Sequence, residues 1–162
     1  LFTSIIYPKV LKKALKTADI LIGALHDKCG RSPIIVNEEM VLDMKHGSII
    51  VDVSIDQGGC IETSMPTTHN NPVFQFNGVT HYCVPNMPSR VPRSASFALN
   101  NFFTPIITEI GESGGLDNFL HKDSGFRKGT YVFKGTLSNR FIGESMNLPY
   151  QDIELIIAAY QK

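Results

Sequence analysis

The run VDVSIDQGGC (51–60) carries a strand-like, mostly apolar stretch of chain into an aspartate, Asp56, and then into two glycines. It completes a longer run, HGSIIVDVSI (46–55), which has the pattern of one strand. NEEMVLDM (37–44) precedes it, with a candidate N-cap at Asn37 and carboxylates in its first turn, as is typical of a helix. The stretch therefore predicts a helix that leads into a buried strand, with an ionisable side chain at the end of the strand.

The same order of helix and strand occurs on both sides of this stretch. Pro8 opens a run with apolar residues at helical spacing, and ADILIGAL (18–25) follows as a continuous apolar run of strand length. GVTHYCV (78–84) is a third strand candidate, and the apolar residues 2–6 are a further one. This alternation predicts an α/β fold with a doubly wound parallel sheet covered on both faces, and a mixed α+β sheet is the alternative.

The second half of the chain has a helical pattern. Apolar residues recur at helical spacing over residues 99–110, and Pro105 predicts a kink within that helix. QDIELIIAAYQK (151–162) has the pattern of a final helix. We therefore expect a sheet-containing domain over residues 1–91 and a helical segment over residues 92–162 that packs back on it.

Composition and charge argue against several classes of partner. The chain has 15 Lys and Arg residues and 15 Asp and Glu residues, so no net charge attracts nucleic acid. No run reaches the roughly 18 apolar residues of a membrane helix. Cys29, Cys60 and Cys83 lack the C-x-x-C spacing of a metal or redox site, which predicts a reducing, cytoplasmic setting. The histidines also lack metal-ligand spacing, so we expect no metal, no nucleic acid and no membrane partner.

Asp56 is the first candidate functional residue. In open α/β sheets, ligands bind beyond the carboxyl ends of the strands, where Asp56 is expected. Gly58 and Gly59 would let the backbone approach a ligand closely or adopt φ values closed to other residues. Asp52, inside the predicted strand, needs hydrogen-bonding partners to be tolerated there. The competing interpretation is that Asp56 only caps a turn that the glycines shape.

A second dense loop follows the third predicted strand. HYCVPNMPSRVPRSAS (81–96) contains three prolines, an asparagine and a methionine before the long helix. Prolines reduce the entropy lost in holding a loop still, which suits the wall of a ligand site. A rigid connection between strand and helix, with no ligand, is the alternative.

Together these stretches resemble the alanine dehydrogenase family, which is related to the NAD(H)-binding subunit of proton-translocating nicotinamide nucleotide transhydrogenase. The resemblance lies in ADILIGAL, in EEMVLDMKHGSIIVDVSIDQGGCIETSMPTTH (38–69) and in HYCVPNMPSRVPRSASFAL (81–99). The IDQGGC and CVPNMP runs are specific signals, and IDQGGC favours the alanine dehydrogenase branch. The resemblance implies an incomplete Rossmann-like sheet, the C-terminal half of an NAD-binding domain, followed by C-terminal helices.

The resemblance also implies roles for individual residues. Asp56 falls on the family's catalytic aspartate, which helps to handle proton transfer and developing charge as the amine is oxidised toward the ketone. Asn86 falls on a position that faces both the substrate and the cofactor. The positions implied to line the cofactor, NAD, are Leu25, His26, Val53, Val84, Asn86 and Met87. The implied substrate pair is an amino acid and its 2-oxo acid, and the implied assembly is a homo-oligomer.

Parts of such an enzyme are missing from these 162 residues. No G-x-G-x-x-G loop occurs, and no residue here stands for the family's catalytic histidine or its substrate-binding lysine and arginine. Arg90 occupies a position where the family often has a small residue, which leaves the substrate preference open. We expect no catalysis by this chain alone. We also expect the inner sheet edge at residues 18–25 to be covered by self-association, strand exchange or rearrangement.

The sequence leaves three functional hypotheses open. The first is the C-terminal portion of an NAD-dependent dehydrogenase that converts L-alanine, or a close amino acid, to the 2-oxo acid and ammonia. The second is the NAD(H)-binding subunit of a transhydrogenase, whose partner is a membrane protein. The third is a truncated, non-catalytic binding or assembly module, which the missing phosphate loop favours.

Overall fold

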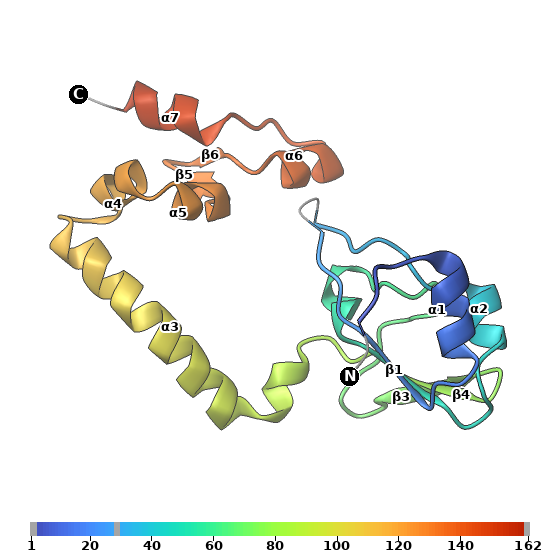
Figure 1. The fold of residues 1–162 in the computed structure, drawn as a ribbon. Helices are drawn as coiled ribbons and strands as arrows, with labels where there is room; N and C mark the ends of the chain where they lie inside the picture. The colour runs from blue at the N-terminus through green and yellow to red at the C-terminus, as the bar shows by residue number, and fades with distance from the viewer. Residues whose placement is uncertain (1–2, 28–29, 161–162) are drawn as a thin grey trace. The chain divides into compact units, whose positions relative to one another are not determined.

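The computed structural model describes residues 3–27 and 30–160, and the chain divides into two compact units, Leu1–Arg90 and Val91–Lys162 (Figure 1). The first unit contains a four-stranded sheet, and the second consists mainly of helices. The functional role assigned to each part, and the packing of one on the other, stay predictions. Cys29 lies outside the described residues.

Three neighbouring strands of the first unit are parallel, as the sequence predicts. They are β1 (Ile20–Gly23), β2 (Ile49–Asp52) and β4 (Val79–Tyr82), and the order across the sheet is β1-β2-β4-β3. Each strand is shorter than its apolar run. The strand predicted over residues 46–55 ends at Asp52, where a 3₁₀ turn begins, so Val53 and Asp56 lie beyond the strand.

The outermost strand, β3 (Val73–Phe76), is antiparallel to β4, so the sheet is mixed at this edge. Asn77 and Gly78 connect the two strands with φ values of 47° and 74°. Positive φ at both positions is the geometry of the tight hairpin turn that an Asn-Gly pair favours. The sequence interpretation assigned no strand to residues 73–76, although Asn77–Gly78 was the signal for one.

One face of the sheet carries the core of this unit. Leu21, Ile50 and His81 form a row across β1, β2 and β4, and Ile50 and His81 are fully buried. The helices α1 (Pro8–Leu15) and α2 (Glu38–Leu42) lie next to one another and cover this face (Figure 1). Leu15 and Met40 belong to the same apolar cluster as Ile50, so both helices pack on one side.

The opposite face of the sheet is open in the part of the chain that the structure describes. Ile20 and Ile22 of β1 are 60% and 64% exposed, and Ile49 of β2 is 40% exposed. The helices of the first unit therefore cover one face of the sheet, and cover on the other face stays a prediction. Both α1 and α2 share the face that carries the core, which leaves the opposite one without helices from the first unit.

Residues 3–7 do not form the strand that was predicted over residues 2–6, whose first residue lies outside the described part. Ile5 and Ile6 are exposed. A strand is stable only when a partner satisfies its backbone groups, and no described strand runs beside this segment. An apolar run alone was not enough to make a strand here.

The second unit begins with the predicted long helix, α3 (Pro92–Glu112). Pro105 lies inside it, and the helix continues through this residue to Glu112. None of its described residues is buried, and Phe102 and Ile107 are 64% and 66% exposed. The apolar face that the sequence predicts is thus present and uncovered.

The remaining elements of the second unit are short. They are α4 (Leu116–Lys122), α5 (Ser124–Gly129), β5 (Val132–Phe133), β6 (Thr136–Leu137), α6 (Arg140–Met146) and α7 (Ile153–Ala159). A small core joins Leu120 of α4, Phe133 of β5 and Ile156 and Ile157 of α7. The helix predicted over residues 151–162 is confirmed for 153–159, and residues 161–162 lie outside the described part.

The buried His81 makes the stability of the first unit depend on pH. Burial lowers the pKa of His81 below its ordinary value. Its Nδ1 lies 3.2 Å from the Val79 carbonyl, which can only accept, and its Nε2 lies 2.8 Å from the Thr63 hydroxyl, so the neutral ring fits both contacts. The unfolded chain binds the proton near pH ~6.5, so the stability from the neutral ring is present above that pH and is lost as pH falls further.

We therefore expect the free energy of unfolding of the wild-type protein to decrease between about pH 6.5 and pH 5. His81→Gln should flatten this slope, and His46→Gln, at an exposed histidine, is the matched control. Urea titrations at each pH measure the effect. Equal slopes for the wild type and His81→Gln would contradict the assignment.

Candidate functional site

The turn that follows β2 is held by the buried carboxylate of Asp52. Asp52 caps the 3₁₀ helix η1 (Val53–Gln57) by accepting a 3.0 Å hydrogen bond from the Ser54 N–H. Its second oxygen accepts a 3.1 Å hydrogen bond from the Cys60 N–H. Asp52 is fully buried. These backbone donors supply the partners that the sequence analysis required for a carboxylate inside the sheet.

Close contacts with neighbouring side chains explain why glycines occur in this turn and at the end of β1. Gly58 and Gly59 have φ values of 89° and 77°, which side chains rarely permit. A Cβ on Gly59 would lie 2.8 Å from Oδ2 of Asp52, and a Cβ on Gly23 would lie 2.5 Å from Sγ of Cys60. Gly23 and Gly59 therefore let two chain segments close around the Asp52 carboxylate.

Asp56 connects the loop after β2 to the loop after β4. The Asn86 N–H donates to Oδ1 of Asp56 at 3.0 Å and faces Oδ2 at 3.3 Å. Asn86 has a φ of 53°, a left-handed conformation that turns its amide toward the neighbouring loop. The carboxylate that caps the local turn is Asp52, whereas Asp56 is exposed and bonded to a residue 30 positions away. Asp56 keeps acceptor capacity for a further partner.

A cavity of about 320 Å³ lies beside Asp56, at the carboxyl ends of β1 and β2. It brings together four of the residues singled out in the sequence: Leu25, His26, Val53 and Asp56. Ala24, Ser54 and Gln57 complete its lining. The parallel pairing of β1 with β2 places the two loops side by side, although they are about 30 positions apart in the chain.

The other three predicted residues lie on the β4 side of the site. Asn86 reaches the group through its bond to Asp56, and Met87 begins the 3₁₀ helix η2 (Met87–Arg90). Val84 is 1% exposed and is not part of the cavity lining. Contact of Val84, Asn86 or Met87 with a ligand stays a prediction.

Two polar residues of the cavity were missed in the sequence. The Ser54 hydroxyl accepts a 2.7 Å hydrogen bond from the Leu25 N–H and donates a 2.8 Å bond to the Leu25 carbonyl. The Gln57 side-chain amide lies 2.7 Å from Nδ1 of His26. Both connect the loop after β1 to the turn after β2. The signal was their position beside Asp56, but their partners are distant in sequence and only the fold shows them.

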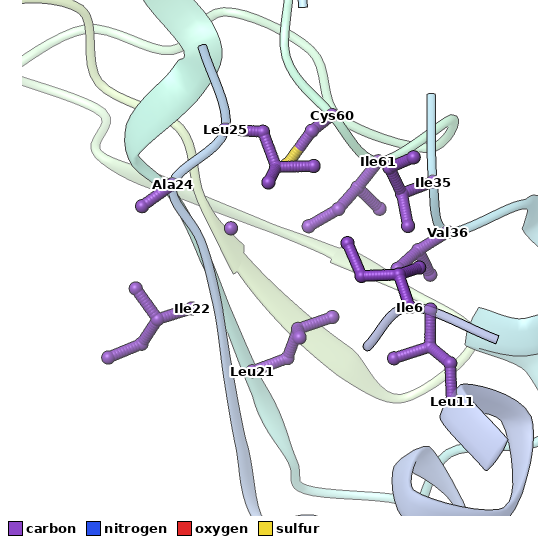
Figure 2. A pocket seen from close by; sticks show the side chains of 11 residues that line it. Ile6, Leu11, Leu21, Ile22, Ala24, Leu25, Ile35, Val36, Cys60 and Ile61 are labelled. Atoms are coloured by element: carbon purple, nitrogen blue, oxygen red, sulfur yellow. The ribbon is translucent and has the colours of Figure 1, made fainter. Parts of the chain in front are cut away.

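A second, apolar cavity of about 250 Å³ lies along β1 (Figure 2). Figure 2 shows Leu21 and Leu25 on one side of the β1 segment, facing Cys60 and Ile61, while Ile22 points to the other side. Among the described strands, only β2 pairs with β1, so the outer edge of β1 is unpaired. The cavity and the edge form one apolar region where the sheet stops.

The remaining candidate groups have structural surroundings. Burial raises the pKa of the Cys60 thiol, and the nearby Asp52 carboxylate raises it further. Burial likewise raises the pKa of the Cys83 thiol. His69 is hydrogen-bonded to Ser89 at 2.7 Å. Within residues 3–27 and 30–160, no group of three or more His, Cys, Asp or Glu side chains is arranged to hold a metal ion. No helix of the described chain is long and apolar enough to cross a membrane.

The fold and the site define a class before any comparison is made. A mostly parallel sheet with helices, in which the candidate residues gather at the carboxyl ends of neighbouring strands, is a Rossmann-like α/β domain. The family model described as alanine dehydrogenase/PNT, C-terminal domain, matches residues 3–140, and the chain belongs to this family.

Individual relatives agree with this assignment. The chain is 40% identical over 147 residues to an alanine dehydrogenase of Halomonas elongata and 37% identical over 148 residues to one of Mycolicibacterium smegmatis. These alignments cover 91% of this chain but only 39% and 40% of the relatives. The chain therefore spans about two fifths of the length of these curated relatives.

Two solved structures give the same picture. An L-alanine dehydrogenase superimposes with a TM-score of 0.74 and 39% identity, over 87% of this chain and 38% of the other. A transhydrogenase from Sinorhizobium meliloti superimposes with a TM-score of 0.56 and 27% identity, over 65% of this chain and 31% of the other. The resemblance stated from the sequence is confirmed, and it includes both branches of the family.

The raised pKa values of Cys60 and Cys83 predict slow chemistry at both thiols. Little thiolate forms near neutral pH, and both side chains are buried, so iodoacetamide should modify them only after unfolding. Mass spectrometry of peptides from Glu-C digestion, with and without urea, measures each site separately, because cleavage after Glu62 separates Cys60 from Cys83. Rapid alkylation of Cys60 in the native protein would show that it is a reactive group of the site.

Proposed function

We propose that the chain is the C-terminal portion of an NAD-dependent amino-acid dehydrogenase that converts L-alanine, or a close amino acid, to its 2-oxo acid and ammonia. The observation that carries this proposal is the position of Asp56. Its carboxylate is held by Asn86 across two parallel strands and borders a cavity with apolar walls. Ligands of open α/β sheets bind at such a position.

The residues present suit one end of NAD. Leu25 and Val53 offer apolar surface to a flat ring, and the Asp56 carboxylate lies at the border of that surface. When bound, NAD supplies the acceptor for the hydride that leaves the amino acid. The described chain offers no glycine-rich loop for the pyrophosphate, so in this proposal the other end of the cofactor is held by further polypeptide.

Asp56 acts on charge in this proposal. An exposed carboxylate with free acceptor positions stabilises the protonated amine of the substrate and accepts a hydrogen bond from it. The Asn86 N–H keeps the carboxylate oriented, because it lies 3.0 Å from one oxygen and 3.3 Å from the other, and both oxygens keep further acceptor positions. The walls at Leu25 and Val53 exclude water from the reacting carbon, which strengthens these electrostatic interactions.

Asp56→Asn in the full-length protein tests this role. We expect turnover of alanine to fall by about 100-fold or more, because the amide cannot balance positive charge, while NAD binding changes little. Steady-state kinetics and NAD titration by fluorescence measure the two effects. Asp19→Asn, at an exposed aspartate whose ion pair with Lys45 lies on the surface, is the matched control. Unchanged turnover in Asp56→Asn would remove Asp56 from the mechanism.

The chain is proposed to act only with further polypeptide. The relatives are about two and a half times as long as the matched part, and among the strands that the structure describes only β2 pairs with β1, which leaves one apolar edge unpaired. We propose that this edge is covered in the native protein, and that the native protein is a cytoplasmic homo-oligomer with a small-molecule substrate. The buried free thiols Cys60 and Cys83 suit a reducing compartment.

The 162-residue chain, produced alone, is expected to self-associate through this region. Ile22→Lys, on the exposed face of β1, should lower the apparent mass in sedimentation velocity, because a charge opposes burial of that surface. Lys122→Ala, in the second unit, is the control for a general change of charge. A monodisperse wild-type monomer whose residues 18–25 are protected from hydrogen exchange would contradict the proposal.

The transhydrogenase branch is the second candidate, because the transhydrogenase structure also superimposes on this chain. A full-length protein that oxidises alanine without a membrane partner would exclude it. A truncated, non-catalytic module is the third candidate. The mass of the native polypeptide decides between the first and the third, since a native chain about the length of the relatives removes the truncated form.

A further inference from the structure

We infer that Asp52 is a positioning residue that holds Asp56 and the Leu25 loop in their working arrangement. This inference rests on the proposed function, because it concerns the same site. Asp52 does not line the cavity beside Asp56, and it has no direct part in the proposed chemistry. Its importance comes from the backbone groups that its buried carboxylate connects, two of them directly and the Leu25 loop through Ser54.

The first segment is the turn that carries Asp56. One oxygen of Asp52 accepts from the Ser54 N–H and the other accepts from the Cys60 N–H. Asp56 lies between these two anchor points, so a single side chain fastens both ends of a loop that spans residues 53–60. Hydrogen bonds from N–H groups to a carboxylate are stronger than bonds between neutral groups. The loop therefore has little freedom to shift Asp56 away from Asn86.

The second segment is the loop after β1. Ser54, fixed through its N–H by Asp52, uses its hydroxyl to bond both the N–H and the carbonyl of Leu25. The chain of contacts from Asp52 through Ser54 to Leu25 therefore sets the distance between two walls of the cavity. A change at Asp52 would reach the Leu25 side and the Asp56 side together.

The third segment is the stretch at Cys60. Its N–H is bound by Asp52, while its carbonyl accepts from the N–H groups of Ile35 and Val36 at 2.9 and 3.3 Å. The end of the loop is thereby attached to the covered side of the sheet. The glycines Gly23 and Gly59 leave room for the carboxylate, since a Cβ at Gly59 would lie 2.8 Å from its Oδ2 and one at Gly23 would lie 3.5 Å from its Oδ1. Aspartate is the only residue that combines this size with two acceptor oxygens.

Asp52→Asn in the full-length protein is the test. The amide has about the same volume but offers one acceptor oxygen, so either Ser54 or Cys60 loses its partner. We expect amide hydrogen exchange at residues 54–60 to rise by about tenfold or more. We expect kcat for alanine to fall by about 10- to 100-fold and KM for NAD to rise by more than about twofold, because the Leu25 wall moves with the Asp56 loop.

Ile50→Val is the matched control. Ile50 is fully buried in the same strand, two residues before Asp52. The substitution removes one methylene from the core, which lowers the free energy of unfolding and changes no group of the loop. Ile50→Val should lower the Tm while kcat and exchange at residues 54–60 stay near the wild-type values. If kcat falls in both variants in proportion to Tm, Asp52 is only structural and the inference is overturned.

The outcomes separate this inference from the proposed function. A wild-type protein that forms no NADH from alanine refutes the proposed function, and the exchange measurement then decides on Asp52 by itself. Wild-type exchange at residues 54–60 in Asp52→Asn overturns the inference in either case. If Asp52→Asn does not fold, Ser54→Ala replaces it, because it removes the hydroxyl bonds to Leu25 and keeps the backbone bond to Asp52. Unchanged kcat and unchanged exchange at Leu25 in Ser54→Ala would also overturn the inference.

Discussion

The parallel pairing of β2 with β1 on one side and β4 on the other determines where the loops of the site begin. Register pairs Gly23 with Asp52 and Val51 with Tyr82, so the three strands reach the same edge of the sheet together. The loop after each strand then starts beside the loops of its neighbours. Leu25, Asp56 and Asn86 come from three separate stretches of sequence, and this register is what places them in one region.

Polar groups inside the sheet do as much as apolar packing to define the site. Asp52 is buried, yet its two oxygens accept hydrogen bonds from backbone N–H groups of the turn that follows it. His81 is buried as a neutral ring between Thr63 and the Val79 carbonyl, and Phe74 stacks on it at 4.8 Å. Each buried polar group imposes a particular geometry on its neighbours, because leaving it unpaired costs more than any single apolar contact returns.

The two units share one property, which is apolar surface left open. In the first unit the exposed row of β1 and β2 and the cavity along β1 are uncovered, and in the second unit the face of α3 is uncovered. In the proposed function, further polypeptide covers surfaces of this kind. The short match to the relatives is consistent with this, since the chain spans about two fifths of their length.

The sequence by itself determined the three parallel strands, the long helix with its internal proline and the placement of Asp56 just past a strand. These features depend on local pattern and on turn chemistry, which neighbouring residues express directly. The sequence did not reveal that residues 3–7 lack strand partners, that β3 pairs antiparallel with β4, or that α1 and α2 pack on the same face of the sheet. Only the tertiary structure decided which carboxylate caps the turn and which is exposed beside the cavity. Asp52 and Asp56 are both aspartates at the end of one apolar run, and they differ in their hydrogen-bond donors. Those donors reach them from Cys60 and from Asn86, which folding alone brings close.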